Sequence, residues 1–155
     1  GLSFIENALI KARALSAIVK SPVIADDSGL VVPSLGGNPG IYSARYAGPA
    51  ASDQDNIKHL LTAFHKNPTL DRQAFFICVM VYLSHANDPC PIIAEGRVYG
   101  EITLDPKGEY GFGYDPIFFL PKHEKTLAEL SPSIKNQISH RFHALQSLKQ
   151  RLTHP

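Results

Sequence analysis

One uninterrupted apolar stretch dominates this sequence, Ala74-Phe75-Phe76-Ile77-Cys78-Val79-Met80-Val81-Tyr82-Leu83. A stretch in which every residue is apolar or aromatic is typical of a β-strand that is covered on both faces. Such a strand lies inside a sheet whose two faces are packed against helices. The stretch therefore predicts a layered domain built around a helix-covered sheet.

Helix and strand patterns alternate on both sides of this stretch. The expected elements are a helix over about residues 4–20, a strand over 22–25, a helix between Ser52 and Asn67, strands over 92–104 and 117–120, and a C-terminal helical region. Strands interleaved with helices predict an α/β fold with a mixed central sheet flanked by helices. Residues 105–116, rich in Gly, Pro and Asp, are expected to form a patterned loop.

Two helix starts carry a local signal. Ser3 with Glu6, and Ser52 with Asp55, have the three-residue spacing with which side chains cap the free backbone donors of a first turn. The first helix then repeats apolar residues at helical spacing, which predicts a face turned to the core. The residues of that face are Ile5, Ala8, Leu9, Ala12, Leu15 and Val19.

The composition fits a single domain over residues 1–155. Apolar residues make up 44% of the chain and charged residues 19%, and 15 Lys and Arg nearly balance 14 Asp and Glu. This balance gives no reason to expect a nucleic-acid polymer or a membrane as partner. Cys78 and Cys90 are too few for a disulfide framework, so free thiols and a cytoplasmic location are expected.

Two adjacent carboxylates, Asp26 and Asp27, follow the apolar run Pro22-Val23-Ile24-Ala25. Carboxylates beside a buried strand cost free energy to desolvate unless a cation or hydrogen-bond donors compensate them. Because neighbouring side chains of a strand point to opposite faces, one carboxylate is expected to hold a divalent cation and the other to orient water or a neighbouring donor. Mg²⁺ suits such a site because it completes its shell with waters and substrate phosphates. The alternative is a simple turn, since Asp, Ser and Gly are common turn residues.

A second motif is Gly111-Phe112-Gly113-Tyr114-Asp115-Pro116. Two glycines on either side of an aromatic residue let the backbone approach a flat ligand, and Phe112 or Tyr114 offers a ring for stacking. The motif is not a dinucleotide fingerprint, because Pro116 stands where a third glycine is required and no helix follows. The alternative is an aromatic hairpin packed on the core.

A third group, Lys135 with His140 and Arg141, lies in the C-terminal helical region. On one continuous helix Lys135 and His140 would lie about 140° apart, too far to converge on one ligand. A break at Ser139, which would cap a new helix, is needed to place His140 and Arg141 in a first turn. The alternative is the solvated outer face of an amphipathic helix.

Taken together, these motifs resemble the inosine triphosphate pyrophosphatase family, and the resemblance covers nearly the whole chain. Five separate signatures occur in the order and spacing of that family, which makes the resemblance far more specific than any one motif. The matching runs are Ser3 to Ala8, Ala25 to Leu30, Leu35 to Tyr46, Gly111 to Phe118, and Lys135 with Ser139-His140-Arg141.

The resemblance implies a mixed α/β fold with an elongated central sheet, usually a homodimer, that acts with Mg²⁺. It implies hydrolysis of aberrant purine nucleoside triphosphates, such as ITP, dITP and XTP, to the monophosphate and pyrophosphate. By the same resemblance, Asp27 is the proton acceptor and a metal ligand. The residues then expected to contact substrate are Ser28, Phe112, Gly113, Tyr114, Asp115, Lys135, His140 and Arg141.

One departure from that family concerns the start of the chain. In the family a first strand, a Ser/Thr-Gly-Asn-x-x-Lys loop and an acidic residue that helps to hold the metal precede the capped helix, whereas this sequence begins at Gly1. The sequence is therefore expected to lack its N-terminal part, including the loop that would bind the triphosphate. The alternative function is a catalytically impaired nucleotide-binding fragment of the same fold.

Overall fold

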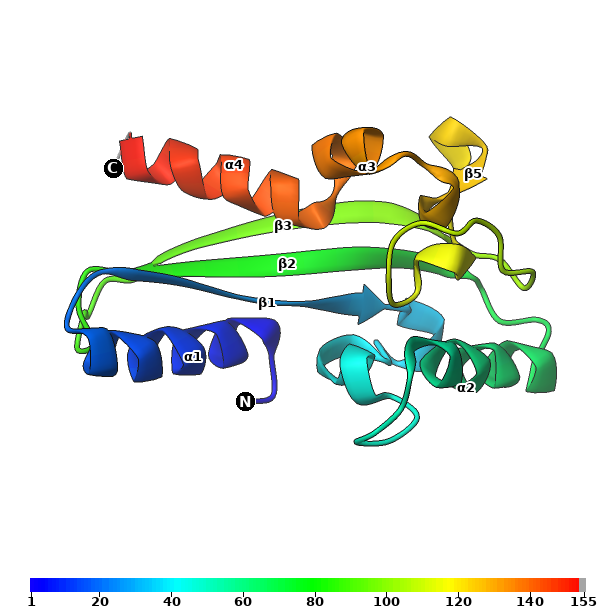
Figure 1. The fold of residues 1–155 in the computed structure, drawn as a ribbon. Helices are drawn as coiled ribbons and strands as arrows, with labels where there is room; N and C mark the ends of the chain where they lie inside the picture. Colours follow the sequence, from blue (N-terminus) through cyan, green and yellow to red (C-terminus); the bar gives the residue numbers. More distant parts are fainter. Residues whose placement is uncertain (154–155) are drawn as a thin grey trace. The chain divides into compact units, whose positions relative to one another are not determined.

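The structure is a computed structural model, and it describes residues 1–153 (Figure 1). Its strands and helices are β1 (Val23–Val31), β2 (Gln73–Leu83), β3 (Ile92–Ile102), β4 (Phe118–Leu120), β5 (Lys125–Thr126), α1 (Phe4–Val19), α2 (Asp53–Lys66), α3 (Pro132–Ile138) and α4 (His140–Thr153). Short 3-10 helices occupy Pro33–Leu35, Gly40–Arg45, Asp115–Ile117, Pro121–His123 and Leu127–Glu129. In this part of the chain the strands form a five-stranded sheet in the order β1-β2-β3-β4-β5, and β4 pairs antiparallel with β3 and β5. The expected α/β fold with a helix-flanked sheet is confirmed.

β2 is the long apolar stretch of the sequence. Only its first residue, Gln73, is exposed, and every later residue of the strand is buried or half-buried. It has a hydrogen-bonded neighbour on each side, β1 and β3. The prediction of a strand covered on both faces is therefore confirmed.

The chain divides into two compact units. Unit 1 comprises Gly1–Ser28, Ile77–Arg97 and the chain from Ser139 onward, and unit 2 comprises Gly29–Phe76 and Val98–Ile138. α1 and α4 belong to unit 1, whereas α2, α3, β4 and β5 belong to unit 2.

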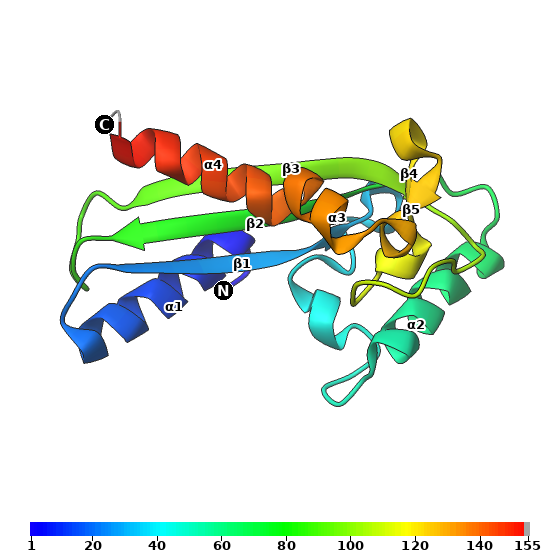
Figure 2. The same cartoon turned by 45° about the horizontal axis from the view of Figure 1, so that its top comes forward.

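In unit 1 the strand segments lie between two helices. Figures 1 and 2 show α1 and α4 on opposite sides of these segments. On the side of α4, β2, β3 and this helix share a small core. Its buried residues are Cys78, Met80, Ala94, Ala144 and Leu148.

The buried stripe of α1 is narrower than predicted. Its buried residues are Ala8, Ala12 and Ser16, whereas Ile5 and Leu15 are each 44% exposed. Small side chains let the backbone of a helix approach its neighbour closely, and the larger apolar side chains are then left at the margins of the contact. The expected core face is therefore confirmed for Ala8 and Ala12, and it was wrong for Ile5, Leu15 and Val19.

Unit 2 is built around α2 and the larger core. The predicted helix start is confirmed, because Ser52 and Asp55 form a reciprocal capping box. The buried face of α2 is formed by Asn56, Ile57, Leu60, Leu61 and Phe64. In the same core the rings of Phe76 and Phe118 lie 4.7 Å apart. Burial of a large apolar side chain in this core contributes about 1.5–3 kcal/mol to the stability of the fold.

Strand β1 continues well past the predicted end of its strand. The sequence favoured a strand over residues 22–25, but β1 runs to Val31 and so contains Asp26 and Asp27. Ser28-Gly29 does not end the strand, because β2 supplies hydrogen-bond partners to its backbone. The two carboxylates therefore lie inside a strand and not in a turn.

The C-terminal helical region is broken at Ser139, the position at which the sequence offered the start of a new helix as the alternative to one continuous helix. α3 ends at Ile138 and α4 begins at His140. The backbone N–H of Phe142 donates to Ser139 Oγ at 3.1 Å, which caps the start of α4. The break leaves Lys135 in unit 2, and it leaves His140 and Arg141 in unit 1.

Two further features concern the length of the helices and the cysteines. No helix within residues 1–153 is long and apolar enough to cross a membrane. Cys78 is a buried free thiol and Cys90 an exposed one.

Candidate functional site

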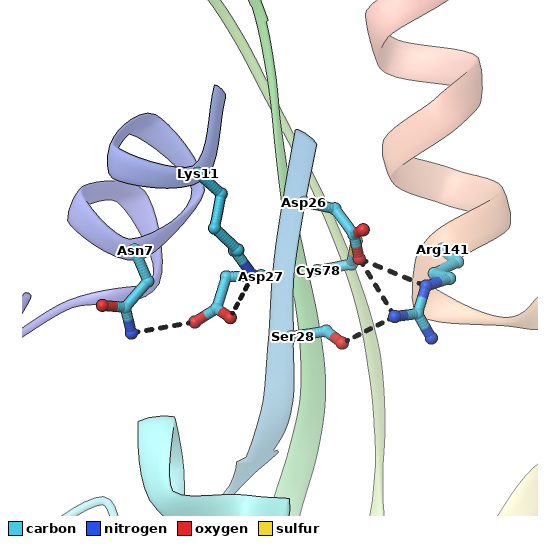
Figure 3. A network of polar contacts seen from close by, with 7 residues as sticks. All are labelled: Asn7, Lys11, Asp26, Asp27, Ser28, Cys78 and Arg141. Atoms are coloured by element: carbon cyan, nitrogen blue, oxygen red, sulfur yellow. Dashed lines mark hydrogen bonds and ion pairs between the residues drawn. The ribbon is translucent and has the colours of Figure 1, made fainter. Parts of the chain in front are cut away.

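The two adjacent carboxylates of β1 point to opposite faces of the strand, as predicted from their neighbouring positions. Figure 3 shows Asp27 directed toward α1 and Asp26 directed toward Arg141, on α4. Both carboxylates lie within unit 1. They therefore belong to two separate clusters of side chains.

The Asp27 cluster consists of Asn7, Lys11 and Asp27. The Lys11 ammonium donates to Asp27 Oδ1 at 2.8 Å, and the Asn7 amide donates to Asp27 Oδ2 at 3.1 Å. Asn7 and Lys11 are four residues apart on α1, so both side chains leave the helix on one face. Because each carboxylate oxygen has a donor of its own, the orientation of the carboxylate is fixed.

The Asp27 carboxylate is partly sheltered from solvent but not closed off. Its side chain is 20% exposed, and that of Lys11 is 50% exposed. A carboxylate in this setting can orient a water molecule and accept its proton, or it can bind a cation.

The metal ligands available at Asp27 can be compared with those that Mg²⁺ requires. This ion is commonly bound by one or two carboxylates together with waters and substrate phosphates. Asp27 offers one carboxylate, and within residues 1–153 no group of three or more His, Cys, Asp and Glu side chains is arranged to hold a metal ion. A cation at this position would take Asp27 as its carboxylate ligand and the rest of its ligands from water and phosphate.

The Asp26 cluster consists of Asp26, Ser28, Cys78 and Arg141 (Figure 3). Arg141 donates to Asp26 Oδ2 from Nε at 3.2 Å and from Nη2 at 3.0 Å, and Nη2 also donates to Ser28 Oγ at 3.2 Å. The Cys78 thiol donates to the same Asp26 oxygen at 3.7 Å. Burial, and then the negative charge of Asp26, raise the pKa of this thiol to about 12, so it stays protonated at neutral pH. Asp26 thus orients a neighbouring donor, as expected for one member of the pair.

Arg141 keeps some capacity to bind a ligand. It lies with the half-buried His140 in the first turn of α4, and its side chain is 47% exposed. Among residues 1–153, Arg141 Nη1 has no hydrogen-bond partner. The guanidinium is therefore oriented by β1 and can still donate to a bound molecule.

The Phe112 cluster lies in unit 2 and consists of Phe112, Asp115 and Lys135. The buried Asp115 carboxylate accepts a hydrogen bond from the Phe112 backbone N–H at 2.8 Å and forms an ion pair with Lys135. The Lys135 ammonium lies 4.6 Å from the centre of the Phe112 ring, which is a cation–π contact. Because Phe112 is 64% exposed, a flat ligand can reach its ring.

The loop that carries Phe112 depends on a glycine and on α2. Gly111 has φ +88°, and a Cβ atom there would lie 2.2 Å from Asp115 Oδ2. Glycine therefore allows both the turn and the close approach of the carboxylate. The Gly113 N–H donates to Oδ2 of Asp53 at 2.6 Å, which ties the loop to the first turn of α2.

Tyr114 has a different environment from Phe112. It is 3% exposed, and its hydroxyl donates to the backbone oxygen of Ser43 at 2.9 Å. Burial raises the pKa of the Tyr114 phenol, which therefore remains neutral. Of the two rings expected to offer a stacking surface, the structure leaves only that of Phe112 accessible.

The structure distributes the expected site residues over the two units. Asp27, Ser28, His140 and Arg141 lie in unit 1, and Phe112, Gly113, Tyr114, Asp115 and Lys135 lie in unit 2. Sequence reasoning missed the partners of these residues, namely Asn7, Lys11, Cys78 and Asp53. For Asn7 and Lys11 a signal existed, because their spacing of four places two polar side chains on one face of a predicted helix.

Comparisons with known proteins agree over nearly the whole chain. The model of the Ham1 family matches residues 1–151. A curated relative from Legionella pneumophila (strain Paris), named dITP/XTP pyrophosphatase, is 55% identical over 149 residues, which are 96% of this chain and 77% of that protein. A relative of the same name from Escherichia coli (strain K12) is 55% identical over 148 residues, covering 96% of this chain and 75% of that protein. A solved structure of a HAM1 protein from Coxiella burnetii has a TM-score of 0.96 at 46% identity and covers 100% of this chain and 79% of that chain.

Proposed function

The chain belongs to the Ham1 family, and on that premise we propose that it hydrolyses aberrant purine nucleoside triphosphates, ITP, dITP and XTP, to the monophosphate and pyrophosphate. This activity removes such nucleotides from the pool available to polymerases. The observation that carries the proposal is the fixed carboxylate of Asp27, in a chain 55% identical to relatives named dITP/XTP pyrophosphatase.

Asp27 is the residue to which we assign the acid–base step. Its carboxylate orients a water molecule and accepts its proton while the water oxygen bonds to the α-phosphorus. The bond from that phosphorus to the bridging oxygen breaks, and pyrophosphate leaves. The two donors on Asp27 support this role, because they hold the carboxylate in one orientation before substrate binds.

Mg²⁺ is the cation proposed for this reaction, with Asp27 as its protein ligand. When bound, it neutralises the negative charge that develops on the leaving pyrophosphate. Lys11, which donates to the same carboxylate, adds positive charge near Asp27. Removal of divalent cations with EDTA should abolish turnover, and added Mg²⁺ should restore it.

The choice of base is assigned to Arg141 and His140. Hypoxanthine and xanthine carry an oxygen at purine position 6, where adenine carries an amino group. A donor such as Arg141 Nη1 that faces this oxygen would meet another donor in adenine, and each unpaired buried group would cost about 1–3 kcal/mol. The orientation of Arg141 by Asp26 and Ser28 supports this assignment.

The residues of the Phe112 cluster are also assigned to substrate binding. The exposed ring of Phe112 suits stacking with a purine. Asp115 accepts a hydrogen bond from the Phe112 backbone, and Lys135 makes a cation–π contact with the ring. Gly113 and the backbone of Tyr114 are the remaining proposed substrate contacts of this loop, because the Tyr114 ring is buried.

We also propose that the protein is a cytoplasmic homodimer that binds no nucleic-acid polymer. The two free cysteines suit a reducing compartment, and the near balance of 15 basic and 14 acidic residues gives no strong field for a polyanion. Sedimentation equilibrium would test the dimer, and a monomer at micromolar concentration would contradict it.

The proposed reaction is tested by following products from ITP, XTP, ATP and GTP with Mg²⁺ in water enriched in ¹⁸O. We expect pyrophosphate and the monophosphate from ITP and XTP, with ¹⁸O in the monophosphate and little turnover of ATP. Release of single phosphate, or ¹⁸O in pyrophosphate, would contradict attack at the α-phosphorus. Binding of IMP without any turnover of ITP would contradict catalysis and favour a nucleotide-binding fragment.

A further inference from the structure

Gly96, on β3, lies directly beneath the backbone of α4. A Cβ atom built on Gly96 would lie 2.2 Å from the backbone nitrogen of Ala144, 2.3 Å from the backbone oxygen of His140 and 2.8 Å from the backbone carbon of His143. All of these residues belong to unit 1. The first turns of α4 therefore contact the strand backbone itself, with no side chain between them.

The absence of a side chain at Gly96 is required by space and not by conformation. Gly96 is not among the glycines with a positive φ, so its backbone accepts any L-residue. Ordinary contacts between non-bonded carbon atoms begin at about 3.5 Å, so one added methyl group would push the helix backbone away by roughly 1 Å. The obstructing atoms are backbone atoms of a helix, which cannot turn aside as a flexible side chain can.

Such a displacement would act on the part of α4 that carries the site residues. His140 is both the first residue of the helix and one of the backbone contacts of Gly96. Arg141 follows it, and its bonds to Asp26 and Ser28 measure 3.0 to 3.2 Å. A shift of about 1 Å would lengthen them beyond the range of a hydrogen bond.

We propose that Gly96 is a positioning residue for base selection, because it lets the first turn of α4 lie close enough to β1 for Asp26 and Ser28 to hold Arg141. This inference rests on the proposed function, in which Arg141 donates to the oxygen of the purine. Gly96 touches no substrate, and it acts on base selection only through the placement of Arg141.

The test is a double-mutant cycle between Gly96→Ala and Arg141→Ala, read as the ratio of kcat/KM for ITP to kcat/KM for ATP. Gly96→Ala should lower this ratio on the order of tenfold, the effect of one misplaced charge-assisted hydrogen bond. In the Arg141→Ala background the same change should leave the ratio unaltered. An unaltered ratio in Gly96→Ala alone, or an equal loss in both backgrounds, would overturn the proposal.

Leu148→Ala is the matched control, because it loosens the packing of the same helix without pushing its first turn. The ITP to ATP ratio should be that of the wild type in this variant, and a loss as large as that of Gly96→Ala would overturn the proposal. If Gly96→Ala does not fold, Asp26→Ala adds no volume and removes both hydrogen bonds from the same guanidinium to Asp26. An unaltered ratio there would equally overturn the proposal.

Turnover of ITP by the wild-type protein distinguishes a failure of this inference from a failure of the proposed function. Wild-type protein that does not release pyrophosphate from ITP would contradict the function, and the role of Gly96 with it. Wild-type turnover together with an unaltered ratio in the variants would contradict the role of Gly96 alone.

Discussion

Lys11→Met removes the charged donor of Asp27 while keeping most of the length of the side chain. The ammonium is the donor to Asp27 Oδ1, at 2.8 Å, and the two side chains are 50% and 20% exposed. An ion pair this open to solvent contributes about 0.2–1 kcal/mol to stability, so we expect the free energy of unfolding to fall by about 1 kcal/mol or less. The effect on turnover should be much larger.

The expected effect on turnover follows from the geometry of the carboxylate. With only Asn7 left as donor, the Asp27 carboxylate can rotate about χ2, for which the energy profile of Asp is broad. Misplacement of a reacting group costs up to about 10²-fold, so we expect kcat for ITP to fall on the order of 10- to 100-fold. Pyrophosphate release and thermal unfolding would be measured on the same preparations.

Lys149→Met is the control for Lys11→Met, because it makes the same change of charge at an exposed position of α4. It should keep the turnover of the wild type. A Lys11→Met protein whose kcat equals that of this control would refute the assignment of Lys11 and Asn7 as the residues that hold Asp27.

Three further variants test other parts of the structure. Phe112→Leu should raise the KM for ITP on the order of tenfold through loss of base stacking, with the melting temperature unchanged because the ring is 64% exposed; an unchanged KM would argue against stacking. Ser139→Ala should lower the free energy of unfolding by about 1 kcal/mol through loss of the α4 cap, as measured in urea, and an unchanged midpoint would contradict the cap. Asp88→Asn should be less stable than wild type at pH 7, because hydrogen bonds from the Ser84 side chain and from the backbone N–H groups of Ser84 and Cys90 lower the Asp88 pKa from 3.8 to about 2. A lowered pKa gives stability that is present above pH 3.8 and lost as the pH falls through 2. The melting temperatures of the two proteins should therefore converge as the pH falls from 3.8 to 2. A difference in melting temperature that stays constant over this range would contradict the role of Asp88.

Local signals in the sequence predicted much of the fold. The apolar stretch that became β2 and the capping box of Ser52 and Asp55 were recognised correctly, because both features are complete within a few residues. For Ser139 the sequence offered two alternatives, a new helix that begins with His140 and Arg141 or one continuous helix, and the structure has the new helix.

Features set by distant contacts could not be predicted in this way. β1 extends past its predicted end because it pairs with β2. That strand begins more than 40 residues further along the chain, so no local pattern in the sequence shows the pairing. The buried stripe of α1 is set by the strands that it packs against, and these favour the small residues Ala8 and Ala12 over longer side chains. Sequence spacing alone gives the face of a helix, but not the depth at which it packs.

In the candidate site, too, local features were predicted and contacts between distant residues were not. The opposite directions of Asp26 and Asp27 follow from strand geometry and were predicted. The donors that hold Asp27 lie 16 and 20 residues away, and Asp53 lies 60 residues from Gly113, so no local pattern joins them.

Asp27→Asn tests the central assignment most directly, because the amide keeps the size of the side chain but cannot take a proton from water. The measurement is the kcat for pyrophosphate release from ITP with Mg²⁺, beside the melting temperature. We expect kcat to fall by about 10²- to 10⁴-fold, with folding retained. A folded Asp27→Asn protein that turns over ITP as fast as the wild type would contradict the assignment.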